Sequence, residues 1–345
     1  MRIPRTALTA LFNRLHDRGD TPFAVAHPSD AVGDLVRIDL DDWDDTPVSF
    51  VHDADSYATA RTAVAREHGE DVAADLPESR SFVMAAVAAG ILPLANADEL
   101  EVFLDRHGDP DLMAGHQPVF AGFDTNLLAW RPDEVLGLRD PDAGLGYVNG
   151  FVLATGVRDE LDWDHKCDDT RRFIDAFGAP FDAYWNQPLG ARREGRLGHE
   201  RYRTIRDIEQ AREIDSEPMD EAIVAAYETF QRDQRGQVVL FSNDRTFVTR
   251  ATDHTLAAQH VAFPRDVPRR ADATWRQLET FVYTLAVLFG IVELPAVTIR
   301  GVWSGKSGLD WQHERLDLDC RSPKIEPELA TDLEVIERYR SLRSD

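Results

Sequence analysis

The sequence predicts an α/β fold built on a central, mostly parallel sheet. An apolar run at 119–123 stops at Asp124, and a second run at 238–241 is followed closely by Asp244. Continuous apolar runs that end in a polar residue are typical of buried parallel strands, and open α/β sheets build their sites at the carboxyl ends of such strands. The region between the two runs alternates strand-like and helical patterns. We therefore expect both acids at one edge of the sheet.

The chain has 345 residues, which is longer than a typical single domain, so we expect additions around the sheet. Residues 1–115 are assigned to an N-terminal α+β region whose role the sequence leaves open. Residues 116–265 are assigned to the α/β domain, and residues 266–345 to a C-terminal helix and β-hairpin. In the N-terminal region, the patterns predict helices at 6–16, 55–68 and 79–89, a helix ending near 107, and strands at 35–40 and 47–51.

Four further elements follow from the patterns of the central and C-terminal regions. A helix is expected over 144–163, because Val152, Gly156 and Glu160 recur at a spacing of four residues. Ser216 is a candidate N-cap for a second helix. After residue 264, a helix is expected over 273–290, then a hairpin that turns at 304–308.

The charge balance predicts a protein adapted to concentrated salt. The formal net charge is −24, and only three of the 38 basic residues are lysines. Such self-repulsion destabilises a compact state in dilute buffer, whereas molar salt shortens the Debye length to about 3 Å. Cys167 and Cys320 lie far apart, which indicates a reduced interior. The apolar run at 281–292 is too short to span a membrane. We expect a halophilic, cytoplasmic protein with no membrane partner.

The two strand ends carry a more specific pattern. The stretch Phe-Asp-Thr-Asn-Leu-Leu at 123–128 and the stretch Phe-Ser-Asn-Asp-Arg at 241–245 together resemble the PIN domain family of metal-dependent nucleases, here as a halophilic, archaeal-type member. The resemblance covers residues 117–264, less than half of the chain. It implies a three-layer α/β/α fold with a central parallel sheet.

The resemblance also implies a set of functional residues. Asp124, Glu160, Asp220 and Asp244 match the family's metal-binding and catalytic carboxylates. Asp159, Asp162 and Asp164 compete with Glu160 for its role, and Glu221 competes with Asp220. Oxygen ligands of this kind suit Mg²⁺ or Mn²⁺, which activate water for phosphodiester hydrolysis. Asn126 and Asn243 are expected to support the site by orienting a ligand or the scissile phosphate.

An arginine-rich insertion at about 186–215 is a candidate RNA contact. Residues 191–206 hold six arginines against two glutamates, in a chain that is otherwise strongly acidic. Basic residues of this kind contact phosphates, and the nearby Tyr184, Trp185 and Tyr202 could stack on unpaired bases. The alternative is a helix whose arginines pair with neighbouring acids. The candidate contacts are Arg192, Arg193, Arg196, Arg201 and Arg203.

The sequence lacks the motifs of a phosphate-binding loop and of a zinc site. Lys306 stands in a Gly-Lys-Ser sequence without the earlier glycine of a phosphate loop, and no His pair has the spacing of a zinc site. The sequence thus predicts a metal-dependent endoribonuclease acting on single-stranded RNA, and a homo-oligomer is compatible with it. Two alternatives stay open: a noncatalytic nucleic-acid-binding or protein-binding scaffold, and a structure-specific DNA nuclease.

Overall fold

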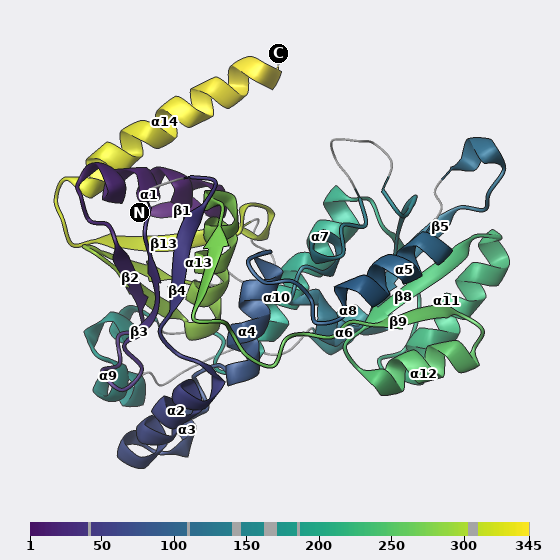
Figure 1. Cartoon of the computed structure of the whole chain (residues 1–345), viewed down its shortest axis with the longest axis horizontal. Helices are drawn as coiled ribbons and strands as arrows, with labels where there is room; N and C mark the ends of the chain where they lie inside the picture. The colour runs from purple at the N-terminus through teal and green to yellow at the C-terminus, as the bar shows by residue number, and fades with distance from the viewer. Residues whose placement is uncertain are drawn as a thin grey trace. The chain divides into compact units, whose positions relative to one another are not determined.

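The computed structural model describes residues 1–40, 43–108, 111–139, 146–161, 171–184, 187–302 and 310–344. The chain forms two compact units (Figure 1). Unit 1 comprises Met1–Leu92, His165–Arg193 and Arg265–Asp345, and unit 2 comprises Pro93–Asp164 and Glu194–Pro264. No helix among the described residues is long and apolar enough to cross a membrane.

Unit 1 is an antiparallel sheet with helices packed on it. Its eight strands run in the order β1-β13-β12-β11-β2-β3-β4-β10. They are β1 (Arg2–Pro4), β2 (Phe23–Ala26), β3 (Asp34–Ile38), β4 (Thr46–Phe50), β10 (Arg270–Ala273), β11 (Ile291–Leu294), β12 (Val297–Arg300) and β13 (Arg315–Cys320). Helix α13 (Trp275–Phe289) is buried from Leu278 to its end, and it begins with a capping box between Thr274 and Gln277.

The remaining helices of unit 1 surround this core. They are α1 (Leu8–Asp17), α2 (Ala54–His68), α3 (Glu70–Ala73), α4 (Ser79–Ala88), α9 (Arg171–Phe177) and α14 (Ile325–Ser344), with the short η1 (Arg5–Ala7), η3 (Ala179–Ala183) and η5 (Asp310–His313).

The first and last parts of the chain share one sheet. Strand β1 pairs with β13, β2 with β11, and β4 with β10, all antiparallel. The sequence treats 1–115 and 266–345 as separate additions, because pairing between strands so distant in the chain leaves no local pattern. The antiparallel pairing of β12 with β13 matches the predicted hairpin; its turn at 304–308 lies outside the described residues.

Unit 2 holds a five-stranded parallel sheet in the order β7-β6-β5-β8-β9. The predicted α/β class with a parallel sheet is therefore confirmed. The strands are β5 (Val119–Phe123), β6 (Gly150–Ala154), β7 (Arg212–Ile214), β8 (Gln237–Ser242) and β9 (Ala257–His260). The helices are α5 (Ala97–His107), α6 (Thr125–Leu128), α7 (Pro132–Val135), α8 (Thr155–Leu161), α11 (Asp220–Gln234), α12 (Arg245–Asp253) and most of α10 (Arg192–Arg203), with the short η2 (Leu112–Ala114) and η4 (Thr204–Ile208).

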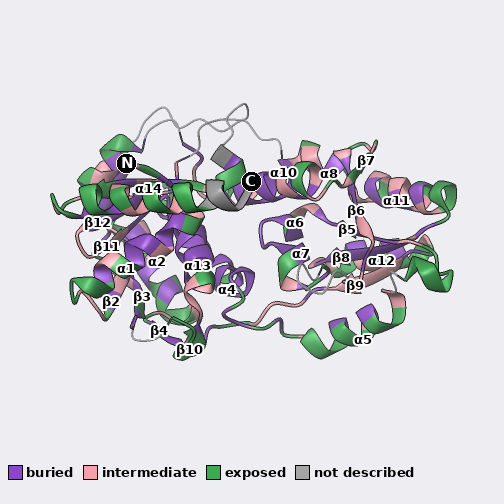
Figure 2. Cartoon of the chain, turned by 90° about the horizontal axis from the view of Figure 1, so that it is seen from above, coloured by how far each residue is buried: buried purple, intermediate pink, exposed green. Residues whose placement is uncertain are grey.

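Helices cover both faces of this sheet. On one face, α11 packs Tyr227 so close to Gly122 that a Cβ there would lie 2.7 Å from the ring. On the other face, Phe103 of α5 meets Phe241 of β8 edge to face. Consecutive residues of the central strands β5 and β8 are buried (Figure 2). Because successive strand residues point to opposite faces, both faces of these strands are covered.

Two predicted boundaries in this unit are wrong. The expected helix over 144–163 is instead strand β6 followed by α8, since the run Phe151–Ala154 is buried on both faces like its parallel neighbours. Helix α11 starts at Asp220, and its N-cap is Met219 rather than Ser216. The Ser216 hydroxyl instead accepts a hydrogen bond from the Gly156 amide, so this serine joins the loop before α11 to the first turn of α8.

Candidate active site

The strand order of unit 2 reverses between β5 and β8. From β5 the chain builds outward through β6 to β7, and it then crosses to β8 on the other side of β5. Open α/β sheets bind ligands outside the carboxyl ends of the strands at such a switch point. Asp124 follows β5 directly, and Asp244 follows β8 by two residues. The fold thus brings both strand-end acids to this edge.

Backbone and side-chain hydrogen bonds fix these two acids. The Asp124 amide donates to the Phe241 carbonyl at 3.1 Å, which extends the pairing of the strands. The Ser242 hydroxyl donates to the Asp124 carboxylate at 2.7 Å and accepts from the Asp244 amide at 2.8 Å. Ser242 is fully buried and therefore links the two strand ends. This role of Ser242 was not predicted from the sequence, although Ser242 stands within the Phe-Ser-Asn-Asp-Arg stretch at 241–245.

Asp124 is the most perturbed acid of the site. Its exposed fraction is 3%. Its pKa is raised from 3.8 to about 6, chiefly by burial and also by the carboxylates of Asp220 and Glu160. Hydrogen bonds from Ser242 and from the Thr125 amide act in the opposite direction. Three of the predicted carboxylates are thus close enough to interact electrostatically.

Local contacts position Glu160 on α8. The Thr125 hydroxyl, at the start of α6, donates a hydrogen bond to the Glu160 carboxylate. Helix α8 follows β6 without a loop, so Glu160 lies near the carboxyl edge of the sheet. Of the acids that competed with Glu160 for this role, Asp159 pairs with Arg158 at 3.0 Å, and Asp162 and Asp164 lie outside the described residues. Thr125 was not predicted as part of the site.

Asp220 lies in the first turn of α11, where the helix dipole favours a carboxylate. The loop before it is held against α8, because a Cβ at Gly156 would lie 2.3 Å from the Glu217 carbonyl. The Arg250 guanidinium of α12 contacts the Asp220 carboxylate at 2.6 Å. Asp244 caps α12 by accepting a hydrogen bond from the Thr246 amide at 2.7 Å. Each of these two acids therefore has a partner of its own.

The two predicted supporting asparagines also lie at this edge. Asn126 is exposed in the short helix α6. Asn243 is half-buried between Ser242 and Asp244, and its carbonyl lies 3.2 Å from Nε2 of His260. Among the described residues, no group of three or more His, Cys, Asp and Glu side chains is arranged to hold a metal ion. The acids share an edge without forming a closed cage.

The arginine-rich helix differs from the prediction. Arg193, Arg196 and Arg201 are buried, with exposed fractions of 1%, 3% and 7%. Arg193 pairs with Asp75 at 2.9 Å, and Arg196 pairs with Glu200 at 3.0 Å. These arginines therefore match the alternative interpretation, a helix whose arginines pair with acids. Because their side chains are buried, they are not exposed for contact with phosphates.

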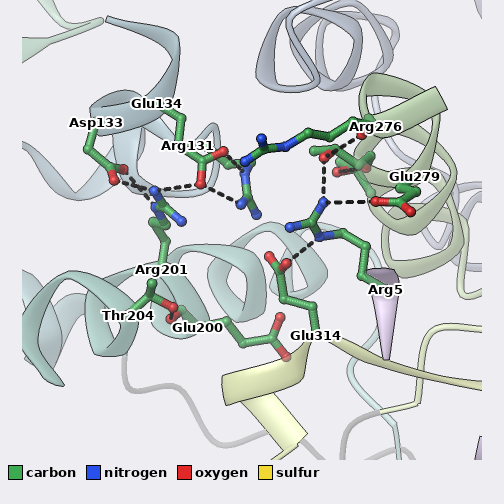
Figure 3. Close-up of polar contacts among 12 residues, drawn as sticks. Arg5, Arg131, Asp133, Glu134, Glu200, Arg201, Thr204, Arg276, Glu279 and Glu314 are labelled. Atoms are coloured by element: carbon green, nitrogen blue, oxygen red, sulfur yellow. Dashed lines mark hydrogen bonds and ion pairs between the residues drawn. The ribbon is translucent and has the colours of Figure 1, made fainter. Parts of the chain in front are cut away.

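Arg201 belongs to an ion-pair cluster within unit 2, in which Arg201, Asp133 and Arg131 are buried and Glu134 is exposed. It binds Asp133 through two nitrogens and lies 2.9 Å from Glu134, which Arg131 also binds (Figure 3). Arg203 is half-buried and Arg192 is exposed. Of the aromatic residues proposed for stacking, Tyr184 and Tyr202 are buried, and Trp185 lies outside the described residues.

Comparison with protein-family models, with curated proteins and with solved structures found no match to this chain. The function is therefore argued from the site alone.

Proposed function

We propose that unit 2 is a metal-dependent endoribonuclease of the PIN type, which hydrolyses RNA phosphodiester bonds at the carboxyl edge of its parallel sheet. The observation that carries the proposal is Asp124, a buried carboxylate at the switch point of the sheet with its pKa raised to about 6. Strongly perturbed acids in this position are candidates for functional groups.

The groups around Asp124 fit Mg²⁺ or Mn²⁺. Its pKa is raised by burial and by two carboxylates, and it is lowered by a hydroxyl and a backbone N–H. The site therefore gathers negative charge around Asp124, and no basic side chain in the described part of the chain is bonded to its carboxylate. Hard divalent cations prefer oxygen ligands of this kind and offset such charge.

Asp124 and Glu160 would hold the cation, with Asp220 and Asp244 completing the ligand set. A bound cation supplies the attacking nucleophile by lowering the pKa of water and stabilises charge on the phosphate. Ser242 holds the Asp124 carboxylate in place, and Thr125 does the same for Glu160. Such oriented neighbours fix the direction of ligand oxygens. Asn126 and Asn243 remain available to orient the phosphate.

The test is cleavage of an end-labelled single-stranded RNA in molar KCl, with Mg²⁺ or Mn²⁺ and with a chelator. We expect cleavage that needs the metal and is lost in Asp124→Asn. The matched control is Asp233→Asn, which removes an exposed acid from the far end of α11 (62% exposed) and should cut like the parent. Equal cleavage by the parent and Asp124→Asn would contradict the proposal.

Further substrates separate the alternatives. Single-stranded and flap-containing DNA of the same sequence are tested beside the RNA. Cleavage of flap DNA alone would favour the structure-specific DNA nuclease. Binding of RNA without metal-dependent cleavage of any substrate would favour the noncatalytic scaffold.

A further inference from the structure

Arg250 joins the two acids that open α11. Its Nη1 lies 2.6 Å from the Asp220 carboxylate, and its Nε lies 3.1 Å from the Glu221 carboxylate. One guanidinium thus binds both carboxylates through different nitrogens. Glu221 had competed with Asp220 for the site role, and the same arginine holds both.

The residue that follows α12 supports this contact. His254, one turn after Arg250, has Nδ1 2.8 Å from Glu228 and Nε2 3.4 Å from Glu221. The contacts of Arg250 and His254 with acids of α11 hold α12 against α11. Arg250 is therefore held beside Asp220 by the packing of two helices as well as by its own charge.

The contact has a consequence for metal binding. The Asp220 carboxylate contacts Arg250 and also contributes to the raised pKa of the buried Asp124. A divalent cation that binds Asp124 and Asp220 together must compete with the guanidinium for the Asp220 oxygens.

We propose that Arg250 is an internal counter-ion that competes with the divalent cation for Asp220 and so lowers the metal affinity of the site. This inference rests on the proposed function, because it requires a cation at these acids. Arg250 acts through Asp220 and is a regulating residue rather than a catalytic one.

The chain offers a matched control for this charge. Arg245, five residues before Arg250 on α12, lines the same open groove and is exposed. Arg245→Gln and Arg250→Gln remove equal charge from one helix. In molar KCl the Debye length is about 3 Å, so a difference between these variants reports direct contact rather than the general field.

The experiment is calorimetric titration of the full chain with Mn²⁺ in molar KCl. We expect Arg250→Gln to bind Mn²⁺ about fivefold more tightly than the parent. This change in affinity corresponds to about 1 kcal/mol, the upper end of the free energies of partly exposed ion pairs. Arg245→Gln should match the parent. Arg250→Lys keeps the charge but loses the two-nitrogen contact, and it should fall between the parent and Arg250→Gln.

The outcomes separate the two proposals. Equal Mn²⁺ affinity in the parent and Arg250→Gln, or weaker binding by Arg250→Gln, would overturn the role of Arg250 and leave the metal site standing. Failure of the parent and every variant to bind Mn²⁺ would overturn the proposed function and this inference with it. Circular dichroism of each variant confirms that the fold is retained.

Discussion

Replacement of Asp124 by Asn should stabilise the metal-free protein, and the gain should depend on pH. The Asp124 pKa rises from 3.8 to about 6 on folding. Because the folded state favours the protonated acid, its contribution to stability is fully present below pH 3.8 and is lost as pH rises through about 6. At 1.36 kcal/mol per pKa unit, the ionised carboxylate costs the folded state about 3 kcal/mol at pH 7.

Asn keeps the shape of the side chain and can accept the Ser242 hydrogen bond without carrying charge. The free energy of unfolding of Asp124→Asn should therefore exceed that of the parent by up to about 3 kcal/mol at pH 7 and by much less at pH 4. The assay is urea denaturation of both proteins at several pH values, in molar KCl without divalent cations.

The exposed control Asp233→Asn should follow the parent at every pH. If Asp124→Asn is less stable than the parent at pH 7, or if its gain is the same at pH 4 and pH 7, then Asp124 is not a buried acid strained by its carboxylate neighbours. The electrostatic basis of the proposed site would then be lost.

Two more changes test the contacts around the site and the arginine-rich helix. Ser242→Ala removes the hydrogen bond that lowers the Asp124 pKa, so the pKa of Asp124 should rise above about 6. A pH titration of the Asp124 carboxyl ¹³C signal measures this pKa. An unchanged midpoint would show that Ser242 does not bond this carboxylate. Arg193→Gln leaves Asp75 buried without its ion pair and frees the carbonyls of Pro188, Asp75 and Leu288, so it should cost about 3–5 kcal/mol in urea unfolding. Arg192→Gln, at the exposed neighbouring position, should change stability by less than about 0.5 kcal/mol, and equal losses in the two variants would contradict the burial of Arg193.

The parts of the fold that sequence patterns predicted are those with local causes. Strands β5 and β8 were predictable because each is a short apolar run that ends at polar residues. Strand β6 was mistaken for a helix, since the four-residue spacing of Val152, Gly156 and Glu160 crosses from a strand into the helix after it. Short apolar runs do not separate the two structures by period alone.

The arginine-rich helix shows what local patterns cannot reveal. Arg193 meets Asp75 across 118 positions of sequence, and Arg201 meets Asp133 across 68. A count of neighbouring charges therefore suggested a basic surface where the fold buries ion pairs. Arg250 was missed for the same reason, because its partner Asp220 lies 30 positions away.

A crystal of the protein soaked in Mn²⁺ tests the central claim most directly. We expect an anomalous peak at the carboxyl edge of the unit 2 sheet, from a Mn²⁺ ion bound by a carboxylate oxygen of Asp124 and by at least one of Glu160, Asp220 and Asp244. A structure in which Mn²⁺ occupies other sites while Asp124 keeps only its hydrogen bonds to Ser242 and the backbone would contradict it.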